Sequence, residues 1–330
     1  MPAAADPAPA VTYANDAEGI DALARAYGEL RREIARVIIG QDAVVQGVIM
    51  SLFANGHALL VGVPGLAKTL LVSTIAEALD LDFKRIQFTP DLMPSDITGM
   101  EILDEHRHFQ FQRGPLFANV VLADEINRTP PKTQAALLEA MQERGVTVAG
   151  TRLDLPAPFF VLATQNPIEQ EGTYPLPEAQ LDRFMFNIEL TYPSYEEEIA
   201  VVKATTANRR VDVEPVVTGA QILEFQRLVR EIPVADNVLE YAVGLAAKTR
   251  PGTAMAPAAV NDYLSWGAGP RASQYLTLGA KVHAAVHGKY SPDREDVQAV
   301  APYVLRHRIV RNFRAEAEGV SVEAVIEGLF

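Results

Sequence analysis

The chain has 330 residues, a net charge of −13 at neutral pH and no cysteine. The lack of cysteine excludes disulfides, a thiolate nucleophile and cysteine-ligated zinc or iron–sulfur centres. The acidic balance disfavours nonspecific binding to nucleic acid or anionic lipid, because the average field of the protein repels phosphate groups.

The chain is predicted to open with an arm and two helices. Residues 1–16 are rich in Ala and Pro, which is typical of a flexible arm, and they lack the basic and apolar regions of a secretory signal. No segment approaches the roughly 18 apolar residues that a membrane span needs, so we expect a cytoplasmic protein. Apolar residues at helical spacing then predict one helix over residues 17–37 and a second after Gly40.

Short apolar runs alternate with helices over the next part of the chain. Strands are predicted at residues 57–61, 83–88, 120–123, 159–163 and 186–190, with a helix at 68–79. This alternation indicates an α/β fold with a parallel sheet covered on both faces. Two weaker alternating stretches, residues 100–112 and 146–155, are predicted to be hairpins inserted into that framework.

A change of pattern near residue 193 marks a predicted domain boundary. Ser194 and Glu197 have the spacing of a capping box, and only helical periodicity follows as far as residue 330. We therefore expect the flexible arm over residues 1–16, an α/β core over 17–192 and an all-helical domain over 193–330.

The loop after the first predicted strand has the composition of a phosphate-binding loop. It reads Gly62-Val63-Pro64-Gly65-Leu66-Ala67-Lys68-Thr69. Small residues allow backbone N–H groups to converge on phosphate oxygens, while the Lys can reach the β- and γ-phosphates and the Thr hydroxyl can bind Mg²⁺. Ala67 replaces a glycine of the general pattern, and alanine disfavours positive φ. A tight turn before a helix-starting Lys is the structural alternative.

Polar side chains end two further predicted strands. Asp124 and Glu125 follow residues 120–123. An Asp in that place lies beside the nucleotide crevice and can hold Mg²⁺ through water, and the adjacent Glu can orient and deprotonate an attacking water. The order of strand, phosphate loop, helix and acid-tipped strand favours this interpretation over two solvated acids. Asn166 follows residues 159–163 and would lie near the γ-phosphate if its strand is central.

Two arginines are candidates to complete such a site. Arg183 lies between a short predicted helix and a strand, and Arg271 opens a helix with Pro270 in its first turn. Phosphoryl transfer gains from cations aimed at the transferred phosphate, although a single Arg more often forms a surface ion pair. His283 and His287 share a helix face, but no third ligand is evident, so metal binding there is the weaker interpretation.

The ordered set GVPGLAKT, VVLADEINR, LATQNP, EAQLDRF and GPRA resembles the MoxR branch of the AAA+ ATPases, from about Ile38 to past Arg271. The resemblance implies a P-loop core with a parallel five-stranded sheet and a C-terminal all-helical lid. The two predicted hairpins match the helix-2 insert and the pre-sensor-1 insert of this clade.

The resemblance also implies roles for individual residues. Lys68 and Thr69 are the implied Walker A pair, Asp124 and Glu125 the Walker B pair, and Asn166 sensor 1. Arg183 is the implied arginine finger for a neighbouring subunit, with Arg128 and Arg113 as alternatives, and Arg271 is the sensor 2 arginine that brings the lid to the nucleotide. The implied nucleotide-binding residues are Ile38, Gly62, Pro64, Gly65, Leu66, Ala67, Lys68, Thr69 and Leu70.

In functional terms, the resemblance implies a Mg²⁺-dependent ATPase that forms a homo-oligomeric, hexameric ring. Such a ring would use ATP to remodel or mature a partner, for which the resemblance implies a von Willebrand A-domain protein, with metal insertion as one form of that maturation. The alternatives are a nucleotide-gated binding scaffold, a chelatase-like motor subunit and a nucleic-acid motor, the last disfavoured by the acidic charge.

Overall fold

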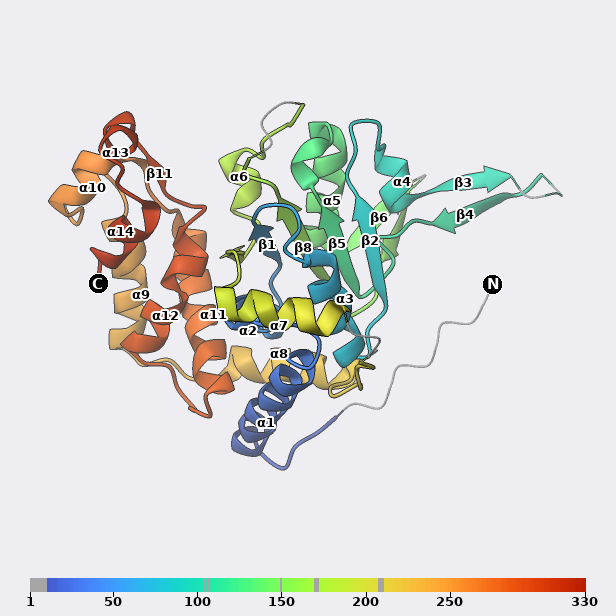
Figure 1. Ribbon diagram of the computed structural model, residues 1–330, viewed down its shortest axis with the longest axis horizontal. Helices are drawn as coiled ribbons and strands as arrows, with labels where there is room; N and C mark the ends of the chain where they lie inside the picture. The colour runs from blue at the N-terminus through green and yellow to red at the C-terminus, as the bar shows by residue number, and fades with distance from the viewer. Residues whose placement is uncertain (1–10, 104, 106, 149, 169–171, 207–210) are drawn as a thin grey trace.

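The computed structural model describes residues 11–103, 105, 107–148, 150–168, 172–206 and 211–330 (Figure 1). Its centre is a five-stranded sheet in the order β2-β5-β8-β1-β9, in which all neighbouring strands are parallel. The strands are β1 (Ala58–Val61), β2 (Phe83–Gln87), β5 (Val120–Asp124), β8 (Phe160–Gln165) and β9 (Phe186–Glu189). These are the five apolar runs predicted as strands, so the α/β core is confirmed.

Both faces of the sheet are covered because successive side chains of a strand point to opposite sides. In β1, Leu60 packs with the helices on one face, whereas Leu59 packs with α5 and α4 on the other. The helices of the core are α1 (Asp16–Ile34), α2 (Asp42–Phe53), α3 (Lys68–Ala78), α4 (Pro94–Thr98), the 3₁₀ turn η1 (Ile126–Arg128), α5 (Pro131–Glu143) and α6 (Glu178–Leu181). Burial on both faces explains why the central strands β1, β5 and β8 are continuous apolar runs rather than alternating ones.

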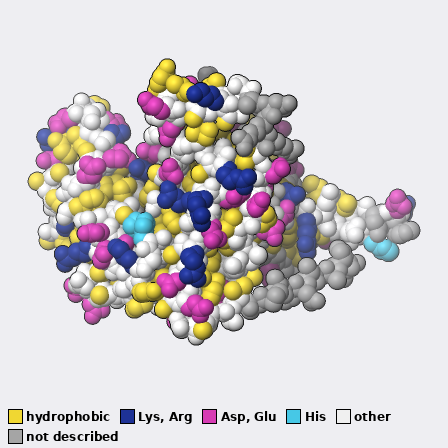
Figure 2. Space-filling view, turned by 60° about the horizontal axis from the view of Figure 1, so that its bottom comes forward, with side chains coloured by type: hydrophobic (Ala, Val, Ile, Leu, Met, Phe, Trp, Pro, Cys, Tyr) yellow, Lys and Arg dark blue, Asp and Glu magenta, His cyan; other side chains and the backbone are white. Residues whose placement is uncertain are grey.

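Both predicted hairpins are present. The first joins β3 (Gly99–Leu103) to β4 (Phe109–Arg113), and the second joins β6 (Gly145–Val148) to β7 (Thr151–Asp154), each antiparallel. The β3–β4 hairpin projects from the body of the molecule (Figure 1 and Figure 2). Leu103 and Phe109 near its tip are 60% and 72% exposed, which leaves an apolar surface without cover.

The C-terminal part is a helical lid with one addition. Its helices are α7 (Tyr195–Thr206), α8 (Gly219–Glu231), α9 (Asp236–Lys248), α10 (Ala258–Tyr263), α11 (Pro270–Val286), α12 (Arg294–Leu305), α13 (Phe313–Ala317) and α14 (Val322–Glu327). Ser194 and Glu197 form the expected capping box at α7. The lid was expected to be all-helical, but it also contains an antiparallel pair of strands, β10 (Leu264–Trp266) and β11 (Val310–Arg311). These strands are too short to produce a readable periodicity in the sequence. None of the helices within the described residues combines the length and apolar character that a bilayer crossing requires.

The hydrophobic core is continuous across the predicted boundary near residue 193. One cluster of buried side chains runs from Ile20 in α1 to Leu329 beyond α14, and α11 of the lid packs against α1 and α2 of the core. The arm is docked in part, because Tyr13 stacks on Phe225 with 6.3 Å between ring centroids. Residues 1–10 of the predicted arm lie outside the described residues.

A buried histidine fixes the start of β1. His57 accepts the Val161 N–H at Nδ1 (3.0 Å), and its Nε2–H donates to the carbonyl of Met141 (3.2 Å). The ring is therefore neutral, and burial, helped by the nearby Arg144 charge, lowers the pKa of His57 to about 3.

This pKa predicts acid sensitivity. Below pH 6.5 the unfolded chain binds a proton at His57, whereas the folded chain does not bind it until the pH approaches 3. The folded state therefore loses stability as the pH falls from 7 toward 3. At pH 5 we expect a loss of about 2 kcal/mol from this group. Urea unfolding at pH 7.5 and pH 5.0 measures the change in the free energy of unfolding. In a His57→Gln variant, this change should be smaller than in the wild type by about the same 2 kcal/mol. Equal changes in both proteins would contradict the low pKa of His57.

Candidate nucleotide-binding site

The loop between β1 and α3 has the backbone shape of a phosphate cradle. A Cβ on Gly62 would lie 2.8 Å from the Leu190 Cβ, so only glycine fits there, and Gly65 has a φ of +87°. Ala67 has a φ of 53°, the left-handed conformation that glycine adopts freely, at a cost of about 1–2 kcal/mol for alanine. The departure from the general motif therefore keeps the loop's shape. Lys68 opens α3, and its Nζ donates to the carbonyl of Gly62 at the loop's start.

Asp124 and Glu125 lie at the carboxyl end of β5, and Thr164 of β8 orients both. The Thr164 hydroxyl donates to Asp124 Oδ1 (2.6 Å) and accepts the Glu125 N–H (2.8 Å). Glu125 has a φ of 57°, a left-handed conformation that is uncommon outside glycine and clusters at functional sites. The hydrogen bond to Thr164 holds that backbone in place.

Two side chains of the edge strand β2 hold the outer oxygens of the same carboxylates. Arg85 donates to Asp124 Oδ2 from Nη2 (2.6 Å) and from Nε (3.1 Å), and Gln87 Nε2 donates to Glu125 Oε2 (2.8 Å). Arg85 Nη2 also donates to Gln87 Oε1 (2.5 Å). The sequence analysis missed both residues. Their two-residue spacing on a predicted strand was the available signal, but only the strand order shows that this strand lies beside the acids.

Asn166 follows β8, which lies between β5 and β1 as the sequence analysis required. Its side chain is buried, and Oδ1 accepts the Ile168 N–H (3.1 Å), whereas Nδ2 has no hydrogen-bond partner among the described residues. A buried donor without a partner costs about 1–3 kcal/mol. A phosphate oxygen at the mouth of the loop would satisfy it, so the residues present fit a nucleotide.

The remaining expected ligands surround the loop. Thr69 lies in the first turn of α3 and offers a hydroxyl which, together with the Asp124 carboxylate, suits the oxygen preference of Mg²⁺. Leu70 is 46% exposed beside the loop. Gln41 donates from Nε2 to the Thr191 carbonyl (2.9 Å), which places residues 37–41 near the loop, although Ile38 itself is buried in the core.

Arg183 and Arg271 lie at the opposite side of the sheet from the phosphate loop, beside the amino ends of the strands. The Met185 N–H donates to the His57 carbonyl (2.8 Å), so the residues before β9 lie beside the start of β1, whereas the phosphate loop follows its end. Arg271 Nη1 pairs with Asp182 Oδ2 (3.1 Å). The structure therefore places Arg271 beside Asp182, just before β9, and not beside the phosphate loop of its own chain. The resemblance had implied that Arg271 would bring the lid to the nucleotide.

The chain matches two family models. Residues 57–186 match "ATPase family associated with various cellular activities (AAA)", and residues 256–329 match "AAA lid domain". Chaperone MoxR1 of Mycobacterium tuberculosis is 43% identical over 316 residues, covering 94% of this chain and 82% of the relative. Protein MoxR of Methylorubrum extorquens is 31% identical over 300 residues, covering 86% and 87% of the two chains. A crystal structure from Cytophaga hutchinsonii, of a protein assigned as an ATPase, superposes with a TM-score of 0.88 at 42% identity and covers 94% and 95% of the two chains.

The chain belongs to the MoxR family of AAA+ ATPases. Its enzymatic activity is ATP hydrolysis, and the family assignment explains why a P-loop core and a lid occur together. The five-stranded AAA+ core and helical lid expected from the motifs are confirmed.

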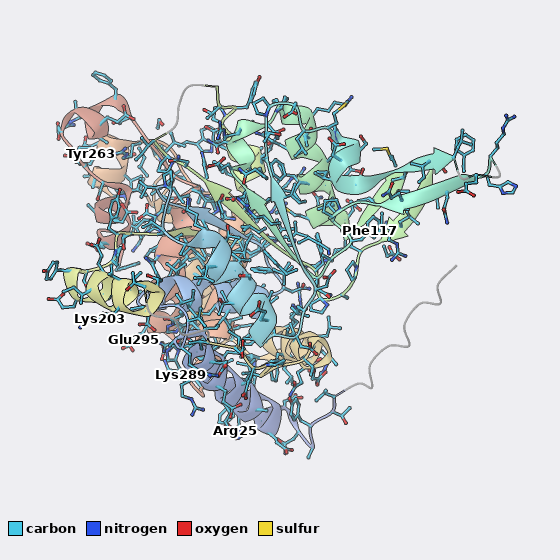
Figure 3. All side chains as sticks on the ribbon, turned by 45° about the vertical axis from the view of Figure 1, so that its right-hand side comes forward. Arg25, Phe117, Lys203, Tyr263, Lys289 and Glu295 are labelled. Atoms are coloured by element: carbon cyan, nitrogen blue, oxygen red, sulfur yellow. The ribbon has the colours of Figure 1, made fainter. Side chains whose placement is uncertain are left out.

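Three arginines of this MoxR protein are candidates for the arginine finger, and their side chains have different contacts. Arg128 pairs with Glu125 of its own chain (3.1 Å), and Arg113 lies over the Phe117 ring, 5.3 Å from its centroid. Figure 3 labels Phe117 at the base of the β3–β4 hairpin. The Arg183 guanidinium makes no hydrogen bond or ion pair with any other residue that the structure describes. It lines a cavity of about 490 Å³ beside the C-terminal half of α5.

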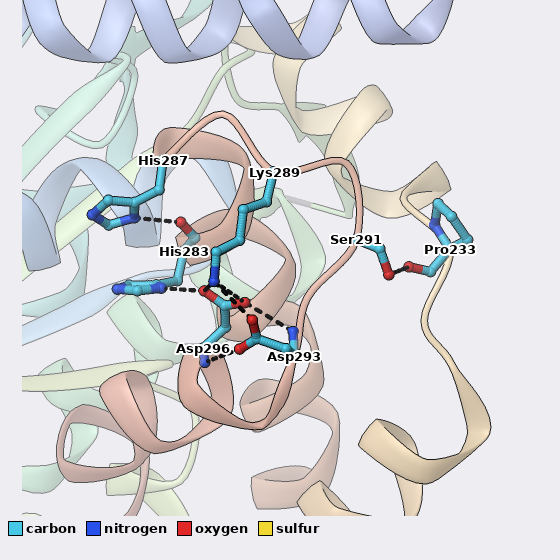
Figure 4. A network of polar contacts seen from close by, with 7 residues as sticks. All are labelled: Pro233, His283, His287, Lys289, Ser291, Asp293 and Asp296. Carbon is cyan, nitrogen blue, oxygen red and sulfur yellow. Dashed lines mark hydrogen bonds and ion pairs between the residues drawn. The ribbon is translucent and has the colours of Figure 1, made fainter.

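The two histidines of the MoxR lid, His283 and His287, are held by hydrogen bonds within the lid (Figure 4). His283 Nδ1 bonds to Asp296 Oδ1 (2.7 Å), and His287 Nδ1 bonds to the carbonyl of His283 (2.7 Å). Asp296 is fully buried at the start of α12 and also pairs with Lys289 (3.2 Å). Within the described ranges no three His, Cys, Asp or Glu side chains gather as metal ligands. His283 thus links α11 to α12.

Proposed function

We propose that this MoxR protein hydrolyses ATP at the contacts between subunits of a hexameric ring. One observation carries the proposal: the phosphate loop and the carboxylates lie at the carboxyl ends of the strands, whereas Arg183 lies at their amino ends, where its guanidinium has no partner among the described residues. A single chain thus keeps its finger away from its own nucleotide. Head-to-tail contacts between identical chains bring unlike edges together, and such contacts close into a ring when the rotation permits.

Each proposed role follows from a side chain's place. Lys68 and Asn166 Nδ2, which has no partner in the described part of the chain, bind phosphate oxygens, and Glu125 takes the proton of the attacking water. Thr69 and Asp124 would hold Mg²⁺, which neutralises phosphate charge when bound. Arg183, and Arg271 from the same edge, stabilise the transferred phosphate of the neighbouring chain.

We further propose that the ring remodels a partner protein. The projecting β3–β4 hairpin supports this, because Leu103 and Phe109 are large apolar side chains left in solvent, and exposed apolar groups gather at interaction sites. The name of the mycobacterial relative, a chaperone, agrees with such a role. The resemblance to MoxR proteins favours a von Willebrand A-domain partner, with metal insertion as one form of its maturation.

Acidic and basic side chains alternate over the face in Figure 2 without a broad basic band, which disfavours a nucleic-acid motor.

The ring predicts a specific dependence on protein concentration. We expect the rate of ATP hydrolysis per subunit to rise sigmoidally with protein concentration, because mass action assembles the contacts that complete each site. Steady-state phosphate release over a wide concentration range, beside size measurement by light scattering, checks this. A rate that stays constant per subunit while light scattering reports monomers would contradict a site completed between chains.

A further inference from the structure

We infer that Arg85 competes with the metal ion for Asp124 and so ties metal entry to nucleotide entry. The inference deepens the proposed function, since it rests on Asp124 being the carboxylate that serves Mg²⁺. In this view Arg85 is a positioning residue, because in this structure it contacts the carboxylate that serves the metal.

The contacts of Asp124 leave no acceptor oxygen unengaged. Oδ1 accepts from the Thr164 hydroxyl (2.6 Å), and Oδ2 accepts from two nitrogens of Arg85 (2.6 and 3.1 Å). The Asp124 side chain is only 13% exposed, so solvent contributes little to its neutralisation. The guanidinium is therefore a counter-charge in direct contact with this carboxylate.

A guanidinium and a divalent cation exclude one another at a single carboxylate oxygen. Both need the negative charge of Oδ2, and two cations at one oxygen repel strongly in a partly buried site. A metal ion alone must displace Arg85 without compensation. A metal ion that arrives on a nucleotide brings negative phosphate groups, and these can receive the displaced guanidinium.

Arg85 has the freedom that such a displacement needs. Its side chain is 45% exposed, and its other hydrogen bond goes to Gln87 Oε1 on the same face of β2. The guanidinium can therefore leave Asp124 while its link to Gln87 remains. Arg128 and Lys68 also carry positive charge near the acids.

The test compares nucleotide binding with and without metal. A fluorescent, non-hydrolysable ATP analogue is titrated in Mg²⁺ and again in EDTA. The Kd in EDTA divided by the Kd in Mg²⁺ measures how much the metal contributes to nucleotide binding. We expect Arg85→Gln to raise this ratio about fivefold, as loss of a half-exposed competing ion pair implies. Arg85→Lys should raise it less. Lys84→Gln, on the other face of β2, is the matched control and should leave it unchanged.

Each outcome has one meaning. A ratio that is unchanged or smaller in Arg85→Gln, with circular dichroism showing a folded protein, overturns the inference, because Arg85 would then be neutral or helpful to the metal. If the wild-type chain itself gains nothing from Mg²⁺, the proposed site at Asp124 and Thr69 fails instead. The wild-type titration therefore separates the two.

Discussion

A Glu125→Gln chain is expected to bind ATP and to hydrolyse it about 10²–10³ times more slowly than the wild type. The amide keeps the shape of the side chain and can still contact Gln87, which bonds to Glu125 Oε2 at 2.8 Å. It cannot take a proton from water, so the chemical step alone should suffer. Steady-state phosphate release gives the rate, and a fluorescent ATP analogue gives the affinity.

Glu77→Gln is the matched control for this prediction, because Glu77 is an exposed acid on α3 away from the carboxylates. It should change neither quantity. Hydrolysis at the wild-type rate in Glu125→Gln would exclude Glu125 as the base. The same variant separates a motor from a nucleotide-gated scaffold, since only a scaffold would keep its effect on a partner when ATP binds without turnover.

A mixture of two inactive variants is expected to recover activity. Arg183→Ala should lower hydrolysis about 10³-fold by removing the finger, and Lys68→Ala should abolish productive phosphate binding. In a mixed ring, the intact loop of one variant meets the intact finger of the other. With equal amounts and random assembly, about a quarter of the contacts should be complete, so phosphate release should recover to about that share of the wild-type rate.

Arg152→Ala controls for general damage, because Arg152 lines the same cavity as Arg183 but pairs with Asp154 on the surface. It should keep near wild-type activity alone. If light scattering shows mixed rings and the mixture still hydrolyses no ATP, Arg183 is not supplied to a neighbouring chain. Arg113, over the Phe117 ring, would then be the next candidate.

The central strands were readable from the sequence because they are buried on both faces and therefore stand out as apolar runs such as residues 120–123. The phosphate loop and the acids were readable because their chemistry requires particular residue types in a fixed order. Strand order was not readable, since it depends on packing between segments far apart in the chain. The roles of Arg85 and Gln87 beside β5 follow from that order and so were missed.

The lid was predicted less completely for a related reason. Helical periodicity located its long helices, but β10 and β11 have three and two residues, too few for a pattern. The place of Arg271 beside Asp182 depends on how the lid packs against β9. That packing involves buried side chains of both segments, and no local spacing in the sequence encodes it.

The shared core of sheet and lid has a mechanical consequence. Swinging the lid away from the sheet would expose the apolar surface between α11 and the helices α1 and α2, and it would break the ion pair of the buried Arg308 with Asp182 (2.8 Å). Close-packed interiors resist such separation and transmit strain instead. We therefore expect each chain to move as one rigid body, so that in the proposed ring the work of a nucleotide cycle is delivered at the contacts between subunits rather than by bending within one subunit.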